Sequence, residues 1–517
     1  SWSGSLAVGG TESNIVIGNY NFSSGIVQTL RIWVENPNGG IDLNSANDDI
    51  SKDISASLCG TYTLGGTNPD FASFSELSTI LNNAGMTCPV TINVRDGIYN
   101  EQFILSNVTG NSFTNTITIQ GESGDSSLAQ IYWASNNFDN NVISFSNIKG
   151  ITLKDLYLRF SSPNYDVSSI TNCDSVLFTN CLIQTYLSFY NSSGVTIKNS
   201  YFKNAYVSFS DNANANKQLT LNMTNNILGD TLNPNGTYVS IYKNYDNNFK
   251  VLIDNNILSQ SYAVNADYRS GSSGATFSDT LIVSNNKSIY YNDNYTSNLD
   301  IYGGYTNDDY IVFKNNDLQG VSMRFYQCDS IISNRFVNIH NQSYGVMLTY
   351  GGYFANNYID VSSSGSSNVN GLYITGDNSP ITVAHNSINH TAFAGSAMYV
   401  ASDISAGLKV KNNILYTSGG GIPLKAVTQS NVDWDYNCYY NNVGNTLASY
   451  NGNNYSSVSA LGTVLGSDAN SLNLNPFFIS DTNLTINQAL LQEGTLLSSA
   501  PLDINGTSRT SPTTMGA

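Results

Sequence analysis

One short phrase recurs through the middle of this chain and limits what the chain can fold into. A few alternating apolar residues are followed by Asn, by one further residue, and then by Ile, Leu or another bulky side chain. A recurrence of this kind indicates stacked coils, because each unit buries its apolar side against its neighbours. We therefore expect a solenoid rather than a globule with one central pocket. Copies of the phrase occupy residues 195–201, 221–228, 251–258, 312–318, 353–359 and 408–415.

The spacing of the phrase indicates strands. Apolar residues alternate before the Asn, as in Leu219, Leu221 and Met223, which is the pattern of a β-strand. Successive copies lie 18 to 30 residues apart, enough for three short strands and three turns. The variable length indicates that some turns absorb insertions while one corner stays fixed. The sequence therefore predicts an all-β protein, a parallel β-helix of about fifteen coils.

The Asn has a physical reason to recur at this corner. It tolerates left-handed backbone geometry and bonds its own main chain in tight turns. Coils rise by about 4.8 Å, so stacked carboxamides can also bond the Asn above and below. We expect an Asn ladder, with Asp155 in the equivalent place earlier in the chain. The ladder positions are Asn180, Asn199, Asn226, Asn256, Asn286, Asn316, Asn334, Asn357, Asn386, Asn413 and Asn437.

Composition excludes two classes of partner. Only 11% of the 517 residues are charged, the formal net charge is −17, and the 20 Lys and Arg are scattered, which argues against nucleic-acid binding. No run of 18 apolar residues exists, so we expect no membrane span. An acidic, Lys-poor surface suits an extracellular setting in which divalent cations bridge carboxylates. Because Ser1–Gly4 reads as the interior of a domain, we expect a processed chain or a segment of a longer one.

The six cysteines match no zinc template. Cys59 and Cys88 flank the first expected helix, and we expect a disulfide between them. Cys173 and Cys181 lie eight residues apart, compatible with a local bridge or with two buried thiols. We expect Cys328 and Cys438 to be core residues.

Residues 1–57 differ from the rest of the chain. Their apolar residues alternate in short segments, and Asn36–Gly39 reads as a turn. Together with Asn47-Asp48-Asp49, this stretch resembles the last strands of an immunoglobulin-like β-sandwich from very large Bacteroidota surface proteins. The resemblance implies that only the C-terminal part of such a module is present. Strands from outside this segment would then complete it. The alternating residues are Trp2, Val16, Ile17, Tyr20, Phe22, Leu30, Ile32 and Val34.

We divide the remaining chain into three parts. In residues 58–150, Ser73 and Glu76 form a capping box, Leu77, Ile80 and Leu81 follow at helical spacing, and Gly85 ends the helix. This part reads as an N-terminal cap with the first coils. The Asn phrase marks 151–450 as the main coils, and 451–517, which lacks the phrase, as C-terminal coils and a cap.

Two segments carry a resemblance to a family. The Gly-x-Tyr-x-Glu phrase at 97–101 is similar to the opening coil of right-handed, pectate-lyase-like β-helices. The closing Asp503-x-x-Gly506-x-x-Arg509 phrase before Gly516-Ala517 resembles the end of secreted Bacteroidota β-helix proteins. The resemblance covers roughly 58–517 and implies a right-handed β-helix and secretion. It leaves function open, because such folds include lyases, hydrolases, epimerases and structural adhesins.

The spacing of acidic and basic residues in the sequence does not predict a catalytic cluster. A lyase needs a base and a cation such as Ca²⁺ among acidic ligands, and the acids, among them Asp279, Asp300 and Asp309, are spread singly over many coils. Hydrolase motifs of the polygalacturonase type are absent. His385 and His390 form at most a weak metal pair, and we expect His385 to point outward in its turn. The candidate bases are Lys243, Lys250, Arg269, Lys287, Lys314, Arg324 and Arg335. We assign no catalytic, cofactor or metal residue, and leave Ca²⁺ binding open.

The 34 tyrosines suit β-sheet surfaces, and exposed ones can stack on sugars or contact other proteins. Four Asp-Ser/Thr-apolar phrases are similar to O-glycosylation sites of exported Bacteroidota proteins, with Ser175, Thr231, Thr280 and Ser330 as acceptors. We expect a structural or adhesive segment of a large extracellular cell-surface protein or filament, which self-assembles or joins neighbouring modules and offers contacts to glycans or other cells. The alternatives are a secreted lyase or hydrolase of acidic glycans, and a carbohydrate-binding module.

Overall fold

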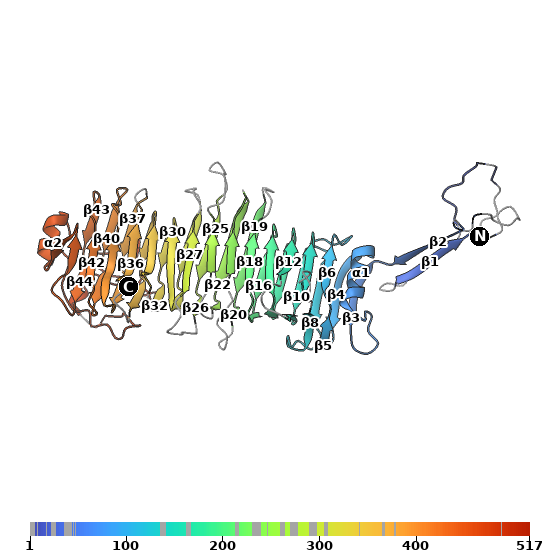
Figure 1. The fold of residues 1–517 in the computed structure, drawn as a ribbon, viewed down its shortest axis with the longest axis horizontal. Coiled ribbons are helices and arrows are strands. Elements are labelled where there is room, and N and C mark those ends of the chain that lie inside the picture. The colour runs from blue at the N-terminus through green and yellow to red at the C-terminus, as the bar shows by residue number, and fades with distance from the viewer. Residues whose placement is uncertain are drawn as a thin grey trace.

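In the computed structural model the chain forms a long parallel β-solenoid with two α-helices, one near each end of the rod (Figure 1). The structure describes all residues except 1–5, 8, 17, 22–26, 36–43, 45, 47, 135–140, 162–166, 212–216, 230–238, 246, 259–263, 269–277, 289–296, 304–308, 341, 364–367, 377–378 and 487–488. The fold class predicted from the Asn phrase is confirmed.

Three sheets run the length of the rod, and the chain visits them in turn. The first sheet contains β3 (Leu58–Leu64), β4 (Met86–Val94), β7 (Ile117–Gly121), β10 (Lys149–Lys154), β13 (Asp174–Thr179), β16 (Val195–Lys198), β19 (Gln218–Thr224), β22 (Asn248–Asp254), β25 (Thr280–Ser284), β28 (Tyr310–Lys314), β31 (Ser330–Ile332), β34 (Gly352–Ala355), β37 (Ile381–Ala384), β40 (Leu408–Lys411) and β43 (Val432–Asp435).

The second sheet contains β5 (Gly97–Asn100), β8 (Ala129–Trp133), β11 (Tyr157–Phe160), β14 (Leu182–Gln184), β17 (Tyr201–Phe202), β20 (Ile227–Leu228), β23 (Ile257–Leu258), β26 (Lys287–Ser288), β29 (Asp317–Gln319), β32 (Arg335–His340), β35 (Tyr358–Ser362), β38 (Ser387–His390), β41 (Ile414–Thr417) and β44 (Cys438–Asn441).

The third sheet contains β6 (Phe103–Ser106), β9 (Ile143–Ser146), β12 (Val167–Thr171), β15 (Tyr186–Tyr190), β18 (Val207–Ser210), β21 (Val239–Tyr242), β24 (Val264–Asp267), β27 (Ser297–Tyr302), β30 (Val321–Tyr326), β33 (Tyr344–Thr349), β36 (Asn368–Thr375), β39 (Ala394–Val400), β42 (Ile422–Ala426), β45 (Ala448–Tyr450) and β46 (Asn453–Tyr455).

The pairing within these sheets is parallel, except that β46 pairs antiparallel with β45. The sheets hold 15, 14 and 15 strands, so the number of complete coils is slightly below the predicted fifteen. Alternate residues point inward and are buried, as Val251 and Ile253 are. The residues that follow each of them, Leu252 and Asp254, are only partly buried. One continuous apolar core results. Edge-to-face rings such as Phe209 and Phe249, 5.4 Å apart, stack along it.

The corner between the first and second sheets is short and constant. From β10 and β11 through β43 and β44, two residues separate each first-sheet strand from the following second-sheet strand. The first residue of each pair, which we call the outer position, has a positive φ, as at Asn225, Asn255 and Asn315. Asn is favoured there because its side chain tolerates left-handed backbone. The second residue, the inner position, is buried, as at Asn226, Asn256 and Asn316.

The inner asparagines form a continuous ladder from Asn226 to Asn437. Each donates its Nδ2 to the Oδ1 of the next one at 2.9–3.1 Å and its backbone N–H to the same oxygen at 2.9–3.0 Å. Nδ2 also donates to a carbonyl oxygen at the end of a preceding first-sheet strand, at 2.9 or 3.0 Å. The amide therefore satisfies polar groups that water does not reach.

Two of the predicted ladder positions are wrong by one residue. Asn180 and Asn199 are exposed, with φ of 53° and 52°, so they occupy outer positions, as does Asp155. The inner positions of the Asn180 and Asn199 coils are Cys181 and Ser200, and the backbone N–H of Ser200 donates to Asn226 Oδ1 at 3.0 Å. Both positions favour Asn, but for different reasons, so a coil with one Asn does not reveal which position it fills.

A helix covers the N-terminal end of the rod. Helix α1 (Phe74–Ala84) begins at Ser73, whose Oγ accepts the N–H of Glu76, and its C-terminal cap is Gly85 with φ 71°. Its apolar side buries Phe74, Leu77, Ile80 and Leu81, so the open edge of the core is closed. Cys59 on β3 and Cys88 on β4 form a disulfide. The other four cysteines are free and buried, and Cys173 and Cys181 therefore form no local bridge.

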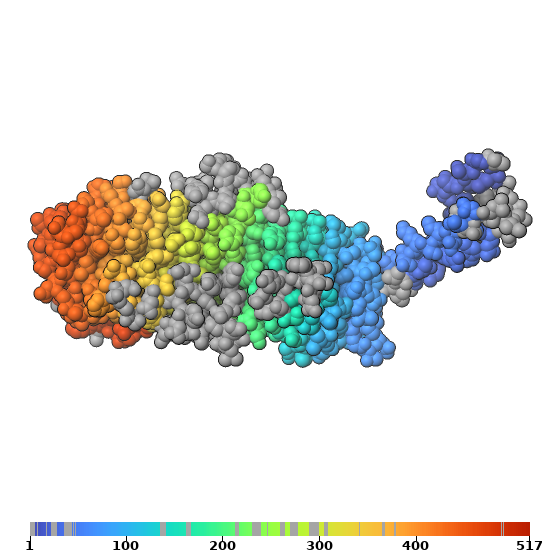
Figure 2. Space-filling view, in the orientation of Figure 1, coloured from blue at the N-terminus to red at the C-terminus, as the bar shows by residue number. Residues whose placement is uncertain are grey.

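A two-stranded antiparallel ribbon projects from the same end, away from the rod (Figures 1 and 2). It pairs β1 (Val27–Trp33) with β2 (Asp49–Ser55), and Ile32 lies opposite Ile50. The described residues of 1–57 contain this one sheet. The immunoglobulin-like assignment stays a prediction, and its turn at 36–39 lies outside the described residues.

The C-terminal segment turns back along the rod. After helix α2 (Val458–Leu465) it crosses the coils of β32 to β44 and contains a short 3-10 helix, η3 (Ala489–Leu491). Leu491 and Met515 bury Ile414 and Cys438 beneath them. Arg509 of the closing phrase donates to Asn356 Oδ1 at 2.9 Å and to Gly516 O at 3.0 Å. Because the bond to Asn356 spans 153 residues of sequence, the tail is fastened to the coils that it crosses.

Candidate functional site

Among the described residues, Lys243, Arg324 and Arg335 each pair with one Asp. Lys243 Nζ lies 2.5 Å from Asp279 Oδ2, and both side chains are buried. Arg335 pairs with Asp317 at 3.6 Å and also donates to Thr482 O at 2.5 Å. Lys250, Lys287 and Lys314 lie on outward positions of separate strands, and Arg269 lies outside the described residues. Pairs of this kind neutralise charge within the rod and do not form a catalytic cluster.

The two histidines do not form a metal site. His385 is fully buried, although it lies in the turn where we expect it to point outward. It takes an outer position with φ 54°, but the C-terminal segment covers it, and burial lowers the pKa of its imidazole to about 3. His390 Nε2 lies 2.8 Å from Val369 O. Across the described part of the chain, no three His, Cys, Asp or Glu side chains are grouped so that they could hold a metal ion.

The outward side of the third sheet carries a run of tyrosines, which we call the tyrosine face: Tyr302, Tyr326, Tyr344, Tyr373 and Tyr399. All five are partly exposed. Strand register stacks four of them in two columns, because Tyr302 lies opposite Tyr326 and Tyr373 opposite Tyr399. Their inward neighbours, such as Phe325 and Leu372, belong to the core. The alternation of the strand therefore holds each ring on the outside of the rod.

The rings lie close together in two groups, one of Tyr302 and Tyr326 and one of Tyr344, Tyr373 and Tyr399. Centroids are 5.7 Å apart for Tyr302 and Tyr326, 6.5 Å for Tyr344 and Tyr373, and 5.3 Å for Tyr373 and Tyr399. The interplanar angles are 53°, 40° and 89°, so the rings are tilted rather than coplanar. This is a ridged aromatic surface, not a flat stacking platform.

Arg324 sits between the rings and is held from three sides. Its Nη1 donates to the Tyr302 hydroxyl at 2.9 Å and its Nη2 to the Tyr344 hydroxyl at 3.1 Å, and Asp300 lies 3.7 Å from Nε. Burial acts to lower the pKa of the guanidinium, but these hydrogen bonds act to raise it, and the pKa ends above its usual range. Arg324 therefore stays protonated and fixes the orientation of both tyrosines.

The face ends at a second cation. Lys425 lies opposite Tyr399 in the strand register, and its Nζ is 4.7 Å from the centre of that ring. Asp300, Arg324, Met347, Tyr373, Tyr399 and Lys425 thus follow one column over six coils. Sequence reasoning noted the abundance of Tyr but missed this column. The signal was present, because Tyr373 and Tyr399 precede inward-facing Ile374 and Val400 on successive coils.

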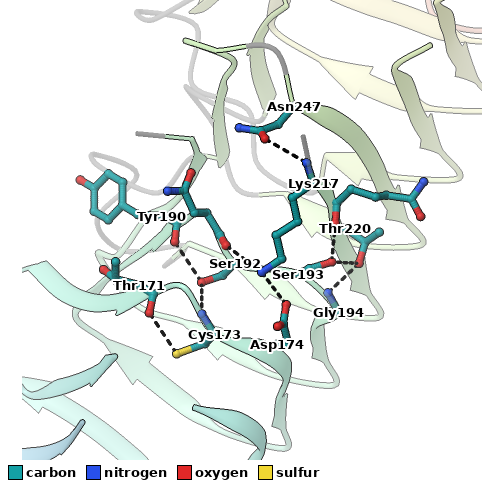
Figure 3. Close-up of polar contacts among 12 residues, drawn as sticks. Thr171, Cys173, Asp174, Tyr190, Ser192, Ser193, Gly194, Lys217, Thr220 and Asn247 are labelled. Carbon is teal, nitrogen blue, oxygen red and sulfur yellow. Dashed lines mark hydrogen bonds and ion pairs between the residues drawn. The ribbon is translucent and has the colours of Figure 1, made fainter. Parts of the chain in front are cut away.

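Three of the predicted O-glycosylation acceptors, Ser175, Thr280 and Ser330, lie at the start of first-sheet strands, at the corner that follows the third sheet. Figure 3 shows this corner around Asp174, which pairs with Lys217 at 2.8 Å. Ser193 Oγ and the Gly194 N–H both contact Thr220 Oγ1 there, at 3.4 and 2.7 Å. The arrangement ties neighbouring coils together.

The Asp of the same phrase has a structural role in two further coils. Asp279 Oδ1 accepts the N–H of Phe249 at 2.8 Å, and Asp329 Oδ2 accepts the N–H of Ile311 at 2.6 Å. Ser175 is exposed, Thr280 and Ser330 are partly exposed, and Thr231 lies outside the described residues. Glycosylation at these positions stays a prediction.

No protein-family profile matches the sequence, and no curated protein matches it. Among solved structures, the chain is similar to a mannuronic acid specific polysaccharide family 6 lyase from the human gut microbiota. The identity is 12%, the TM-score is 0.26, and the match covers 82% of this chain and 89% of the lyase. A likeness of this size says nothing about the activity of this chain. None of the helices in the described residues is long and apolar enough to cross a membrane.

Proposed function

We propose that this protein is a rigid extracellular adhesive rod that binds glycan chains along the tyrosine face. The observation that carries the proposal is the column of Tyr373, Tyr399 and Lys425 beside the clamped Arg324. Aromatic rings present apolar area with a polar tip and lose little conformational entropy when they bind. Such surfaces suit the C–H faces and hydroxyl groups of sugars.

The rod supplies the rigidity that an adhesive surface needs. The column of rings is fixed by the register of successive parallel strands, and the Asn ladder fixes the coils beneath it. A preorganised surface loses less entropy on binding than a flexible one. A glycan that extends along the rod can therefore contact several coils at once, and weak contacts add.

The N-terminal ribbon supports the joining of this segment to a neighbouring module. Ile50 is 65% exposed and Trp33 is 56% exposed, and two antiparallel strands are marginal on their own. Strands of a neighbouring module of the same large protein would cover this apolar surface and complete a sandwich. Hydrogen exchange tests this: the β1 and β2 amides should exchange fast in this segment and slowly in the intact cell-surface protein. Equal rates in both would contradict it.

The enzymatic alternative has no described residue to support it. A lyase requires a base that is unprotonated and can accept a proton from the substrate. The hydrogen bonds around Arg324 keep that side chain protonated. Lys243 is buried and is held by Asp279 inside the rod. We therefore do not propose catalysis for the tyrosine face.

Affinity electrophoresis against a panel of neutral and acidic polysaccharides tests the adhesive function. We expect at least one polysaccharide to retard the native protein. The Tyr373→Ala/Tyr399→Ala variant should bind it about tenfold or more weakly, because each lost ring contributes roughly 0.5–1.5 kcal/mol beyond its buried area. Tyr310→Ala is the matched control, since Tyr310 is 54% exposed on the first sheet. Retardation by no polysaccharide, or retardation unchanged in the double variant, would overturn the proposal.

A further inference from the structure

A cavity lies at the N-terminal end of the rod, between α1 and the second coil. Its volume is about 570 Å³, within the range of small-ligand sites. One wall is the outer side of α1, which presents Ser75, Thr79 and Asn83 at helical spacing. The opposite wall is the turn after β5, and Trp133 at the end of β8 also lines the cavity. The tyrosine face begins on β27 and does not reach it.

The walls of this cavity are fixed before any ligand binds. Asn82 donates to Ile104 O at 3.0 Å and accepts the N–H of Ser106 at 2.9 Å, so α1 is attached to β6. Glu101 Oε2 accepts the N–H of Ser75 at 2.9 Å and joins the two walls. Trp133 packs against the core. The site is therefore preorganised.

Two amides on these walls have unused hydrogen-bonding capacity. Asn83 and Asn100 are both exposed, and within the described structure neither carboxamide makes a hydrogen bond. Each offers two donors and an acceptor, the set that recognises paired sugar hydroxyls. With an indole beside them, they form a site for a sugar ring rather than for an apolar ligand.

Two strands along the second sheet from Asn100, which lines the cavity, lies Arg159, with which no described acidic residue pairs. On the outward side of the second sheet, Asn100 lies opposite Tyr132, and Tyr132 opposite Arg159. The Arg159 guanidinium is 5.0 Å from the centre of the Tyr132 ring and 5.9 Å from that of Tyr157. Its one hydrogen bond in the described structure goes to Gln130 Oε1, at 3.5 Å. Among the described residues no carboxylate pairs with it, unlike Arg324, which Asp300 and two tyrosines occupy.

From this arrangement we infer a second binding site, for a short acidic oligosaccharide. One sugar ring occupies the cavity against Trp133 and bonds Asn83 and Asn100. The carboxylate of an adjoining sugar lies on Arg159, about 10 Å away at two strand spacings from Asn100. Glu101 favours the same orientation of the oligosaccharide. Its negative charge repels a carboxylate from the cavity, so the neutral ring binds there and the carboxylate binds at Arg159. The site is independent of the tyrosine face.

Calorimetric titration with trigalacturonate and with neutral cellotriose tests this inference on the whole chain. We expect trigalacturonate to bind more tightly than cellotriose. Arg159→Gln should weaken trigalacturonate about tenfold or more and leave cellotriose unchanged, since a charge-assisted hydrogen bond is lost. Asn83→Ala, an exposed change that should not affect folding, should weaken both ligands.

The double variant of the tyrosine face separates the two sites. Tyr373→Ala/Tyr399→Ala should leave trigalacturonate binding at the cavity unchanged, so the two proposals can fail separately. The unfolding temperature of each variant shows whether it is folded. The inference is overturned if trigalacturonate does not bind, or if Arg159→Gln and Asn83→Ala, both folded, bind it as the native protein does.

Discussion

The corner between the first and second sheets and the connection between the second and third sheets behave oppositely. The first has two residues on every coil from β10 onward, whereas the second has one residue between β14 and β15 and ten between β20 and β21. The first also contains the buried Asn ladder. The comparison teaches that one corner with fully satisfied amides is enough to fix the stacking of coils, which leaves the other connections free to vary in length.

Insertion tests this difference most severely. Three Gly residues placed between Asn315 and Asn316 should prevent folding of the native solenoid, because they break the ladder and shift the register of every following strand. The same insertion between Val443 and Gly444 should be tolerated, since Val443 is 62% exposed and a longer loop costs little entropy. Thermal unfolding followed by circular dichroism measures both. Similar behaviour of the two insertions would show that the corners are equivalent.

The ladder amide itself should account for much of that effect. Asn316→Ala removes the acceptor of the Asn286 backbone N–H and one of the two acceptors of its Nδ2, and it leaves Val283 O without its side-chain donor. Each stranded buried group costs about 1–3 kcal/mol, so we expect the free energy of unfolding to fall by about 3–5 kcal/mol. Urea denaturation measures it. A loss below about 1 kcal/mol would mean that water enters and replaces the amide.

An acidic side chain on the second sheet should respond to pH, whereas the neutral ladder should not. Burial raises the pKa of the Asp360 carboxyl from 3.8 to about 7. The folded protein therefore holds a proton that the unfolded chain has lost, and the free energy of unfolding falls as pH rises from about 4 to about 7. The full effect is at most about 4 kcal/mol.

Replacement of that acid checks the pH effect. Asp360→Asn should flatten the dependence of the unfolding free energy between pH 4 and 7, while keeping contact with Asn389, whose Nδ2 lies 2.8 Å from Asp360 Oδ1. Asp254, partly exposed on the first sheet, supplies the control as Asp254→Asn. An unchanged slope in Asp360→Asn would assign the pH dependence to other groups.

The outer position should show the smallest effect and a different chemistry. Asn315 is exposed with φ 55°, and its Nδ2 donates to Asn285 Oδ1 at 3.3 Å on the surface, so we expect the position to depend mainly on its backbone conformation. Asn315→Gly should change stability by less than about 0.5 kcal/mol, while Asn315→Val should cost about 1–2 kcal/mol, because a β-branched residue disfavours positive φ. Two equal losses would indicate that the outer carboxamide contributes to stacking.

The sequence was sufficient for the architecture because the repeated phrase reports a local rule. Strand alternation, the fixed corner and the capping box around Ser73 and Glu76 all act within a few residues, so they are visible without a structure. The inner position that we predicted for Asn199 is held by Ser200, and this error shows the limit of that reasoning. Residue type alone does not distinguish an Asn that tolerates positive φ from one that bonds its neighbour.

The candidate site was harder to predict because it depends on which coils lie side by side and on which side chains cover others. The clamp on Arg324 joins residues from three coils, and coil length sets which residues meet. The burial of His385 follows from the C-terminal segment, which lies far away in sequence. No periodic pattern announces either contact.

The hydrogen bonds from one ladder side chain to the next all run toward the following coil, and this gives the rod a direction. Every inner Asn donates toward the coil that follows it, from Ser200 at the start to Asn437, which donates to Ser471 Oγ at 2.8 Å. During synthesis from the N-terminus, each new coil therefore supplies the acceptor that the previous coil lacks. The corner itself does not limit the length of the rod, because the same corner can repeat indefinitely. The ladder ends where the serine hydroxyl takes the place of the next amide.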